Sequence, residues 1–266
     1  MSEPARSHGR GRRFFLESQI AGRDGALELG LSSDDLHHLT AVLRAGPGDE
    51  VVVVEPDGSA WRARVVSCSR EALIGEIVSG VERLEPAGVT LFQGIATAGK
   101  LDLVVEKATE LNIESVVPVI TERSSVRLDL HGRKRRAERL RRVALAAAKQ
   151  SGRGSVMEVG DPITLPEVAS RCAEYDAMLV VWEDAAVSGP GVGQALDEAG
   201  VAGDARVALV VGPEGGLTSA EVYLLESAGA RAVTLGETVL RTETAGIVAA
   251  ALCAYELGGL GGRPRA

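Results

Sequence analysis

The chain has 266 residues, of which 45% are hydrophobic, and its formal net charge is −8. This length allows two modest domains or one large one with a buried core. No stretch is apolar over the roughly 18 residues that a membrane span needs, and the basic residues 1–15 lack the apolar core of a secretory signal. Three scattered cysteines, none in a CxxC pair, disfavour a zinc site and indicate a reducing compartment, so we expect a cytoplasmic protein.

The first part of the chain, up to about Val81, has the pattern of a small β domain. Ser32-Ser33-Asp34 can cap a helix whose apolar residues, including Val42, recur at helical spacing. Asp57-Gly58 separates two strand-like runs and predicts a hairpin. These features predict a small β-barrel with one inserted helix. Its strands are expected over residues 14–16, 26–29, 51–54, 61–66 and 73–78.

Beyond a linker at Pro86-Ala87-Gly88, strands and helices alternate. Alternation of apolar strands with helices predicts a parallel sheet covered on both faces, the α/β class. The last helix, Ala245 to Leu257, is apolar nearly all round and should therefore be buried on every side. Strands are expected over residues 89–95, 116–120 and 177–182, and helices over residues 101–111, 135–149 and 165–172.

Two successive strand-to-loop units lie between Val207 and Ala245. The apolar run 208–212 ends in a turn at 213–216, and Thr218 with Glu221 forms a capping box that opens a helix. A second strand at 232–236 leads to a polar turn at 240–244. Glycine-rich turns of this kind often only reverse the chain, but two of them, each at the carboxyl end of a buried strand, favour a ligand crevice. The GxGxxG fingerprint of dinucleotide sites is absent, and without a Walker-type loop a nucleoside triphosphate cradle has no support.

Positive charge is concentrated in two places although the chain is acidic. Four arginines crowd the amino terminus within residues 6–13, and seven basic residues lie between Arg133 and Arg142 with one acid, Glu138, among them. Phosphate binding depends on such local patches, whatever the net charge elsewhere. A solvated helix face would give the same pattern, but its place within an acidic chain favours RNA.

The motifs GPEGGLTSAE (212–221) and LGETVLRTETA (235–245) resemble the carboxyl-terminal signature of the SPOUT methyltransferases. Within that superfamily they are most similar to the enzymes that methylate uridine N3 in small-subunit ribosomal RNA. The resemblance spans about Arg12 to Gly258. Further matching segments are Arg13-Phe14-Phe15, residues 38–44, Gly48-Asp49, Lys100 with residues 106–111, Glu122-Arg123-Ser124 and residues 147–153.

The resemblance implies a PUA-like RNA-binding β-barrel at residues 1–85 and a SPOUT methyltransferase domain at residues 86–266. In that domain a trefoil knot is expected at about residues 178–258, an exception to the rule against threaded loops. It also implies S-adenosylmethionine as cofactor, a homodimer, no metal, and 16S ribosomal RNA as substrate, within the small ribosomal subunit.

The predicted site has three groups of residues. Uridine N3 holds its proton firmly, so a cation that stabilises the anion or a carboxylate that takes the proton would help, and Arg241 and Glu243 are the candidates. An ion pair that merely rigidifies the loop is the alternative. The expected cofactor-binding residues are Val181, Gly212, Pro213, Glu214, Gly215, Gly216, Leu235, Gly236, Leu240 and Thr242. The expected RNA-binding residues are Arg12, Arg13, Arg44, Lys100, Arg123, Lys134 and Arg136.

Two rival functions remain open from the residues alone. A related SPOUT enzyme could methylate a ribose 2′-hydroxyl or another base. A noncatalytic RNA-binding assembly factor could keep the same fold, although the intact signature loops argue against it.

Overall fold

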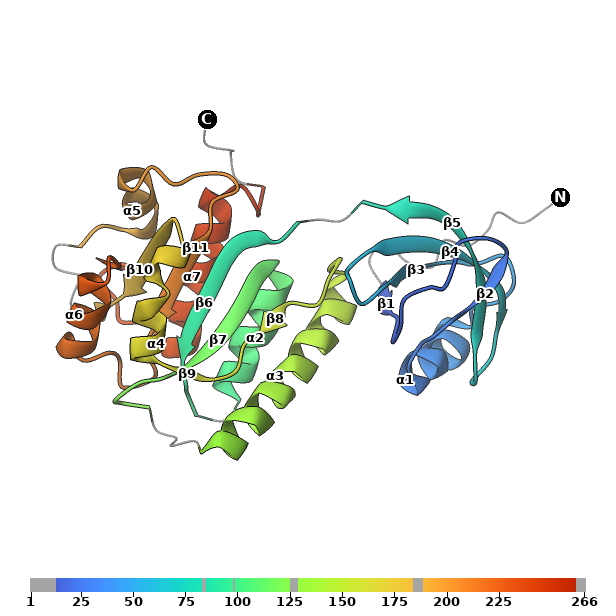
Figure 1. Cartoon of the computed structure of the whole chain (residues 1–266), viewed down its shortest axis with the longest axis horizontal. Coiled ribbons are helices and arrows are strands. Elements are labelled where there is room, and N and C mark those ends of the chain that lie inside the picture. Colours follow the sequence, from blue (N-terminus) through green and yellow to red (C-terminus); the bar gives the residue numbers. More distant parts are fainter. Residues whose placement is uncertain (1–12, 83–84, 98, 125–128, 184–188, 262–266) are drawn as a thin grey trace. The chain divides into compact units, whose positions relative to one another are not determined.

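The computed structural model describes residues 13–82, 85–97, 99–124, 129–183 and 189–261 (Figure 1). The chain divides into two compact units. The first comprises Met1–Glu85 with Ala148–Val156, and the second comprises Pro86–Ala147 with Met157–Ala266. No helix in the described ranges is both long and apolar enough to span a bilayer.

The first unit is built on a five-stranded sheet in the order β1-β3-β4-β5-β2. β1 runs parallel to β3, and the other pairs are antiparallel. The edges β1 and β2 are not paired as a ladder in the described residues, but Glu17 N donates to Gly30 O at 2.8 Å just beyond them. The strands are β1 (Arg13–Phe15), β2 (Ala26–Leu29), β3 (Glu50–Val54), β4 (Ala60–Cys68) and β5 (Leu73–Val81).

The inserted helix covers the expected residues but is less regular than expected. α1 (Ser33–His37) begins at the predicted cap, where the Ser32 hydroxyl accepts from Asp35 N at 3.3 Å. It continues as a π-helical turn, η1 (His38–Leu43). The wider turn changes the helical register, so Val42, expected on the apolar face, is 60% exposed.

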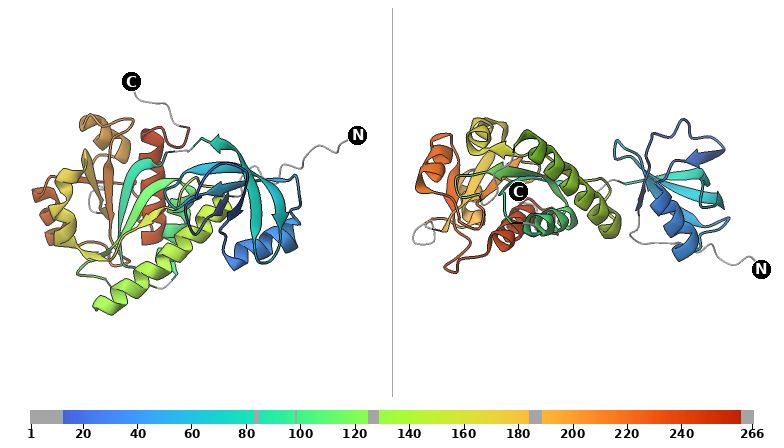
Figure 2. Two further views of the ribbon diagram at one scale, coloured as in Figure 1. Left: turned by 45° about the vertical axis from the view of Figure 1, so that its right-hand side comes forward. Right: turned by 90° about the horizontal axis from the view of Figure 1, so that it is seen from below.

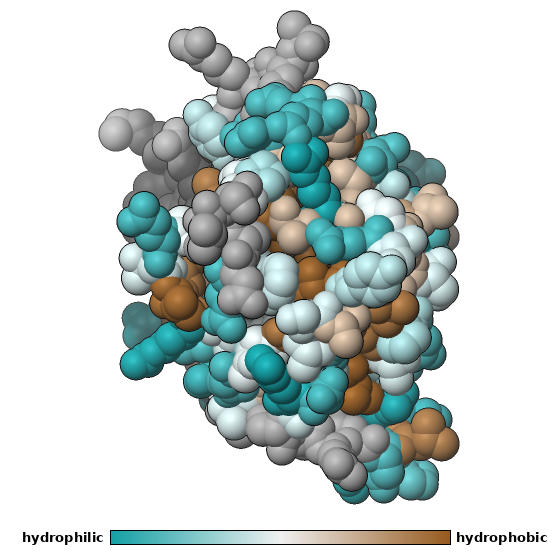
Figure 3. Space-filling view, turned by 90° about the vertical axis from the view of Figure 1, so that its left-hand side faces the viewer, coloured by the Kyte–Doolittle hydropathy of each residue, from teal (hydrophilic) through white to brown (hydrophobic). Residues whose placement is uncertain are grey.

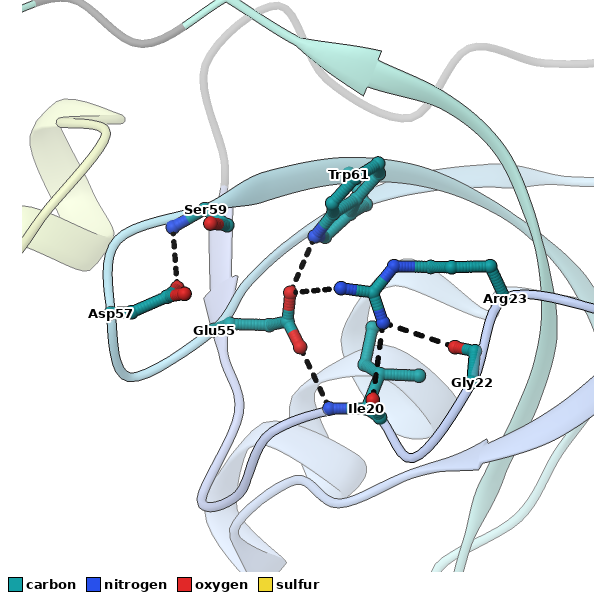
Figure 4. Close-up of polar contacts among 7 residues, drawn as sticks. All are labelled: Ile20, Gly22, Arg23, Glu55, Asp57, Ser59 and Trp61. Atoms are coloured by element: carbon teal, nitrogen blue, oxygen red, sulfur yellow. Dashed lines mark hydrogen bonds and ion pairs between the residues drawn. The ribbon is translucent and has the colours of Figure 1, made fainter.

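A buried carboxylate holds the loop after β1 in the first unit (Figure 4). Glu55, whose side chain is fully buried, accepts from Ile20 N at 2.7 Å, Trp61 Nε1 at 2.6 Å and Arg23 Nη2 at 2.8 Å. The Arg23 guanidinium also lies 4.4 Å from the Trp61 ring centroid. A buried charge is tolerated only when paired in this way, so Trp61 serves the packing of this unit.

The second unit contains a seven-stranded sheet with the order β12-β10-β11-β6-β7-β8, and β9 also pairs with β7. Every pair is parallel, as the alternation predicts. Sequence patterns missed two short strands, β8 (Glu158–Val159) and β9 (Ile163–Thr164). The others are β6 (Ala87–Gly94), β7 (Ile113–Ile120), β10 (Ala177–Val181), β11 (Val207–Val211) and β12 (Arg231–Val233).

Helices cover both faces of this sheet (Figures 1 and 2). α2 (Lys100–Glu110), α5 (Val192–Glu198) and α7 (Thr242–Glu256) enclose one apolar cluster with the sheet. α4 (Leu165–Ser170) and α6 (Ser219–Ser227) enclose the other. The long basic helix is α3 (Leu130–Ser151). On the face that carries α6, hydrophobic residues reach the surface as separate patches among hydrophilic ones (Figure 3).

The last helix differs from its prediction in two respects. It begins at Thr242, because the extended backbone of Arg241 forms the N-cap, so the expected polar turn at 240–244 is largely the first helical turn. It is also buried on one face only. Leu252 and Tyr255, on the opposite face, are 41% and 52% exposed, because no other part of the described chain covers them.

Candidate active site

A cavity of about 300 Å³ lies at the carboxyl ends of β10, β11 and β12. Parallel strands end at the same edge of a sheet, so the loops after them gather there. The predicted loops near Val181, Gly212 and Leu235 therefore surround one space. The lining residues are Lys100, Val181, Trp182, Glu183, Val211, Gly212, Pro213, Glu214, Gly216, Leu217, Thr234, Leu235, Gly236, Glu237, Thr238, Val239, Leu240, Arg241, Thr242 and Ala245.

Glycines in these loops are required by the backbone geometry. A Cβ atom on Gly212 would lie 2.9 Å from the Gly216 carbonyl carbon and 3.0 Å from Leu217 N. Gly216 and Gly236 have φ values of 69° and 114°, which L residues rarely adopt. The cavity wall thus depends on glycine at three positions, two in the GPEGG turn and one in the loop after β12.

Gly215 is the one expected cofactor residue that does not line the cavity. A Cβ atom there would lie 3.0 Å from Arg123 Cβ, and the Gly215 carbonyl accepts from Arg123 Nη1 at 2.8 Å. Arg123, expected on the RNA, is exposed and braces the GPEGG loop from outside.

Glu214 is held by hydrogen bonds from the loop after β6. Thr97 donates to its Oε1 from the backbone N at 3.0 Å and from Oγ1 at 2.6 Å. Burial raises the pKa of Glu214, but the bonds from Thr97, from its own backbone and from Lys100 outweigh burial and lower the pKa to about 2. Glu214 therefore stays ionised and fixes the loop.

The Glu214 carboxylate makes a contribution to the free energy of unfolding that depends on pH. Because folding lowers its pKa from 4.5 to about 2, its contribution is complete above pH ~4.5 and is lost as pH falls toward ~2. We expect Glu214→Gln to reduce the free energy of unfolding at neutral pH by an amount that shrinks across this window. Denaturant titrations at several pH values would measure it, with Glu226→Gln, at an exposed position of α6, as control. An undiminished difference at pH ~2 would contradict this account.

Lys100, expected among the RNA-binding residues, lines the cavity. Its Nζ is 3.2 Å from Glu214 Oε1 and 3.7 Å from Glu243 Oε2, and it is the first residue of α2. Glu243, a predicted catalytic residue, does not line the cavity. The ion pair seen here joins Glu243 to Lys100, in place of the Arg241–Glu243 pair considered from sequence.

Arg241 lines the cavity from the N-cap of α7. It is exposed, and no described residue forms a hydrogen bond or ion pair with its guanidinium. The extended backbone at Arg241, with φ −62° and ψ 149°, sets its direction before the helix begins. The backbone of Arg241 is thus held in place, while its guanidinium is available to a ligand in the cavity.

Sequence reasoning missed Gln93, which lies behind the cavity. Its Nε2 donates to Thr242 Oγ1 at 2.9 Å and to Gly212 O at 3.3 Å. Thr242, expected among the cofactor-binding residues, donates its hydroxyl proton to Gly212 O at 2.5 Å. The signal in the sequence was one amide within an apolar strand, Val89 to Gly94.

The structure divides the basic residues of α3 into two groups. Arg133 donates to Pro162 O at 3.5 Å, Arg139 forms an ion pair with Asp102 of α2, and Arg141 binds Val159 O at 3.0 Å and Asp161 at 2.9 Å. These three attach the helix to its neighbours. Lys134, Arg135 and Arg142 are exposed and have no such partner among the described residues.

The other expected RNA residues differ in exposure. Burial lowers the pKa of both Arg13 and Arg136, which are half-buried. Arg44 is exposed with a left-handed backbone, φ 53°. Arg12 lies outside the described residues. No group of three metal-ligating side chains occurs in the described part of the chain.

Family comparisons agree with this architecture. The RNA methyltransferase domain family matches residues 83–254, and the RNA methyltransferase PUA domain family matches residues 31–78. The chain is thus of the class that joins a PUA-like domain to an RNA methyltransferase domain.

Comparisons with individual proteins show which family within this class the chain belongs to. Ribosomal RNA small subunit methyltransferase E of Bacillus subtilis is 28% identical over 92% of this chain and 96% of its own length. The Synechocystis protein of that name is 31% identical over 83% of this chain and 71% of its own. The Neisseria gonorrhoeae protein, solved bound to S-adenosyl methionine, is 27% identical with a TM-score of 0.75, covering 92% of this chain and 97% of that chain. This chain belongs to the ribosomal RNA small subunit methyltransferase E family, which confirms the resemblance noted in its motifs.

Proposed function

We propose that this chain transfers a methyl group from S-adenosylmethionine to N3 of a uridine in small-subunit ribosomal RNA. The observation that carries the proposal is the glycine-walled cavity with Arg241 on its wall. Relatives named for small-subunit ribosomal RNA methylation cover most of the chain, and one related structure holds the cofactor.

The residues of the cavity fit S-adenosylmethionine. Its volume of about 300 Å³ is at the lower end of small-molecule sites. Leu217, Leu235 and Leu240 offer apolar walls for an adenine ring. Backbone groups at the glycines offer hydrogen bonds at close approach, and Glu183 lines the space as an anionic group for the cofactor's ammonium or ribose hydroxyls. When bound, the cofactor supplies an electrophilic methyl group on its sulfonium.

The chain's own residues then have to align the uracil and favour loss of its N3 proton. The Arg241 cation stabilises the negative charge that develops on the ring, an effect strengthened where water is excluded. Glu243 acts through Lys100, because it contacts Lys100 and does not line the cavity. The uridine has to be unpaired or flipped from its stack before N3 can be reached.

Assembly as a homodimer is part of the proposal. The exposed apolar face of α7, with Leu252 and Tyr255, supports it, because an apolar helix face is stable when covered. Sedimentation should show a dimer. A strictly monomeric, fully active protein would overturn this assignment.

Three further features extend the same proposal. The trefoil knot at about residues 178–258 is proposed from the resemblance of the motifs at 212–221 and 235–245 to the SPOUT signature. The ribosomal substrate supports a cytoplasmic protein that acts on RNA within the small subunit. Residues 1–85 and 86–266 are proposed as the RNA-binding and catalytic domains.

The RNA-binding role of α3 gives a testable prediction. Because Lys134 and Arg135 are exposed and Arg139 is paired with Asp102, the double variant Lys134→Glu/Arg135→Glu should weaken RNA binding. It should also reduce the slope of log Kd against log salt by about one for each phosphate that the protein no longer neutralises. Arg139→Gln is the control. It should lower thermal stability and change the salt slope little. An unchanged slope in the double variant would leave Lys134 and Arg135 as solvated residues only.

The function itself is tested by the reaction product. The purified protein is incubated with radiolabelled S-adenosylmethionine and either free 16S ribosomal RNA or the small subunit, and nucleosides are identified by mass spectrometry. We expect N3-methyluridine. A 2′-O-methylated ribose or another methylated base would reject the base assignment, and cofactor-independent RNA binding without product would indicate an assembly factor.

A further inference from the structure

Gln93 is a fully buried amide at the carboxyl end of β6. It is paired in register with Val211 of β11 and with Pro118 of β7, in the middle of the sheet. Removing an amide from water is costly unless hydrogen bonds replace those to the solvent. Apolar residues are usual at such positions, so a buried amide here indicates a specific role for its contacts.

The amide joins three segments that are far apart in the sequence. Its Nε2 donates to Gly212 O, 119 residues away, at 3.3 Å, and to Thr242 Oγ1, 149 residues away, at 2.9 Å. The Thr242 hydroxyl itself donates to Gly212 O at 2.5 Å. Gly212 begins the GPEGG loop, Thr242 begins α7, and both line the cavity. The three groups form a closed triangle directly behind the cavity wall.

On the side of α7, the helix leaves room for the Gln93 side chain. Gln93 Oε1 has no hydrogen-bond partner among the described residues. It lies so close to the helix that a Cβ atom on Gly246 would be only 2.3 Å from it. Glycine at position 246 therefore gives the amide its room, although glycine is a weaker helix former than alanine.

We propose that Gln93 is a positioning residue that holds the GPEGG loop and the start of α7 at the separation the methyl-donor cavity requires. The inference rests on the proposed function of that cavity. The two segments also meet through the Thr242–Gly212 bond and through Lys100, which pairs with Glu214 and Glu243 at the rim. Gln93 is the fully buried side chain that contacts both segments. Loss of the amide should loosen the cavity wall, and so weaken cofactor binding, without removing any group that touches the cofactor.

A matched control lies in the same strand. Thr90 of β6 is also buried and shares a hydrogen bond of 2.9 Å with the Ser115 hydroxyl. Three residues before Gln93, it points to the other face of the sheet and does not line the cavity. Thr90→Val removes a buried polar contact of similar kind, so it reports the cost to stability alone.

The experiment compares Gln93→Leu with Thr90→Val in the full-length protein. Thermal unfolding measures stability, calorimetry measures the Kd of S-adenosylmethionine, and steady-state kinetics separate KM for the cofactor from kcat. Both variants should be less stable, but only Gln93→Leu should raise Kd and KM, by roughly tenfold or more, with kcat at saturating cofactor changed much less. Equal Kd values for folded Gln93→Leu and the unmodified protein would reject the inference.

A second variant approaches the same amide from the helix. Gly246→Ala should displace the Gln93 side chain and raise the cofactor Kd by a similar factor. In a Gln93→Ala background the added methyl group has room, so Gly246→Ala should then have little further effect. Additive effects of the two substitutions would contradict the proposal, and this cycle decides the matter even if Gln93→Leu does not fold. Failure of the unmodified protein to bind the cofactor would instead reject the proposed function.

Discussion

Arg241→Ala is expected to lower the rate of methyl transfer by about 10²-fold or more, the scale of losing one preorganised charge-stabilising group. The Arg241 guanidinium has no partner among the described residues and lines the cavity, so its charge is available to the developing uracil anion. S-adenosylmethionine binding should change much less. Raising the pH should partly rescue the variant, because the N3 proton then leaves more readily without help.

Single-turnover rates across a range of pH, with cofactor Kd from calorimetry, would test this effect. Arg231→Ala is the matched control, since Arg231 is an exposed arginine of β12 that pairs with Glu198 and does not line the cavity. It should leave the rate within a few-fold. If Arg241→Ala binds the cofactor poorly but transfers the methyl group at the normal rate, Arg241 is a binding residue.

Gly212→Val is expected to abolish detectable S-adenosylmethionine binding, an increase in Kd of more than ~100-fold. Even a Cβ atom at this position would lie 2.9 Å from the Gly216 carbonyl carbon, closer than such contacts are found, so the backbone of the turn would have to move. The branched side chain would then also fill part of the cavity. Calorimetry and thermal unfolding would separate a defect in binding from a defect in folding.

The adjacent loop glycine provides the comparison. Gly215 does not line the cavity, and a Cβ atom there would lie 3.0 Å from Arg123 Cβ, a contact that a shift of a few tenths of an ångström relieves. Gly215→Ala should therefore keep the cofactor Kd within a few-fold. Loss of binding in Gly215→Ala together with normal binding in Gly212→Val would reverse the assignment of the cavity wall.

The two largest predicted effects concern one wall of the cavity. Arg241 supplies charge and Gly212 supplies space, while Gln93 and Thr242 join the segments that carry them. Glu214 and Lys100 fix the rim from the side of α2. Residues that touch the ligand and residues that hold them in place can thus be separated by measuring rate, affinity and stability in the same variants.

Local patterns in the sequence determined most elements of the fold. The capping boxes of α6 and α4, with Thr218–Glu221 and Thr164–Glu167, act over three residues, and alternation of apolar strands with helices indicated the parallel sheet. Because parallel strands end at one edge, the strand pattern also indicated a common crevice for the loops at Gly212 and Leu235, and the motif resemblance added the loop near Val181. Motif resemblance added the family.

Tertiary structure decided the contacts that span the chain. Nothing near Lys100 in sequence indicates that it lies between Glu214 and Glu243, and nothing near Gln93 indicates that it meets Thr242. Such contacts depend on which strands become neighbours, because residues more than a hundred positions apart meet only after the sheet has formed. The sequence by itself therefore determined which loops carry the site, and the packing of the sheet and α7 determined which side chains hold those loops in place.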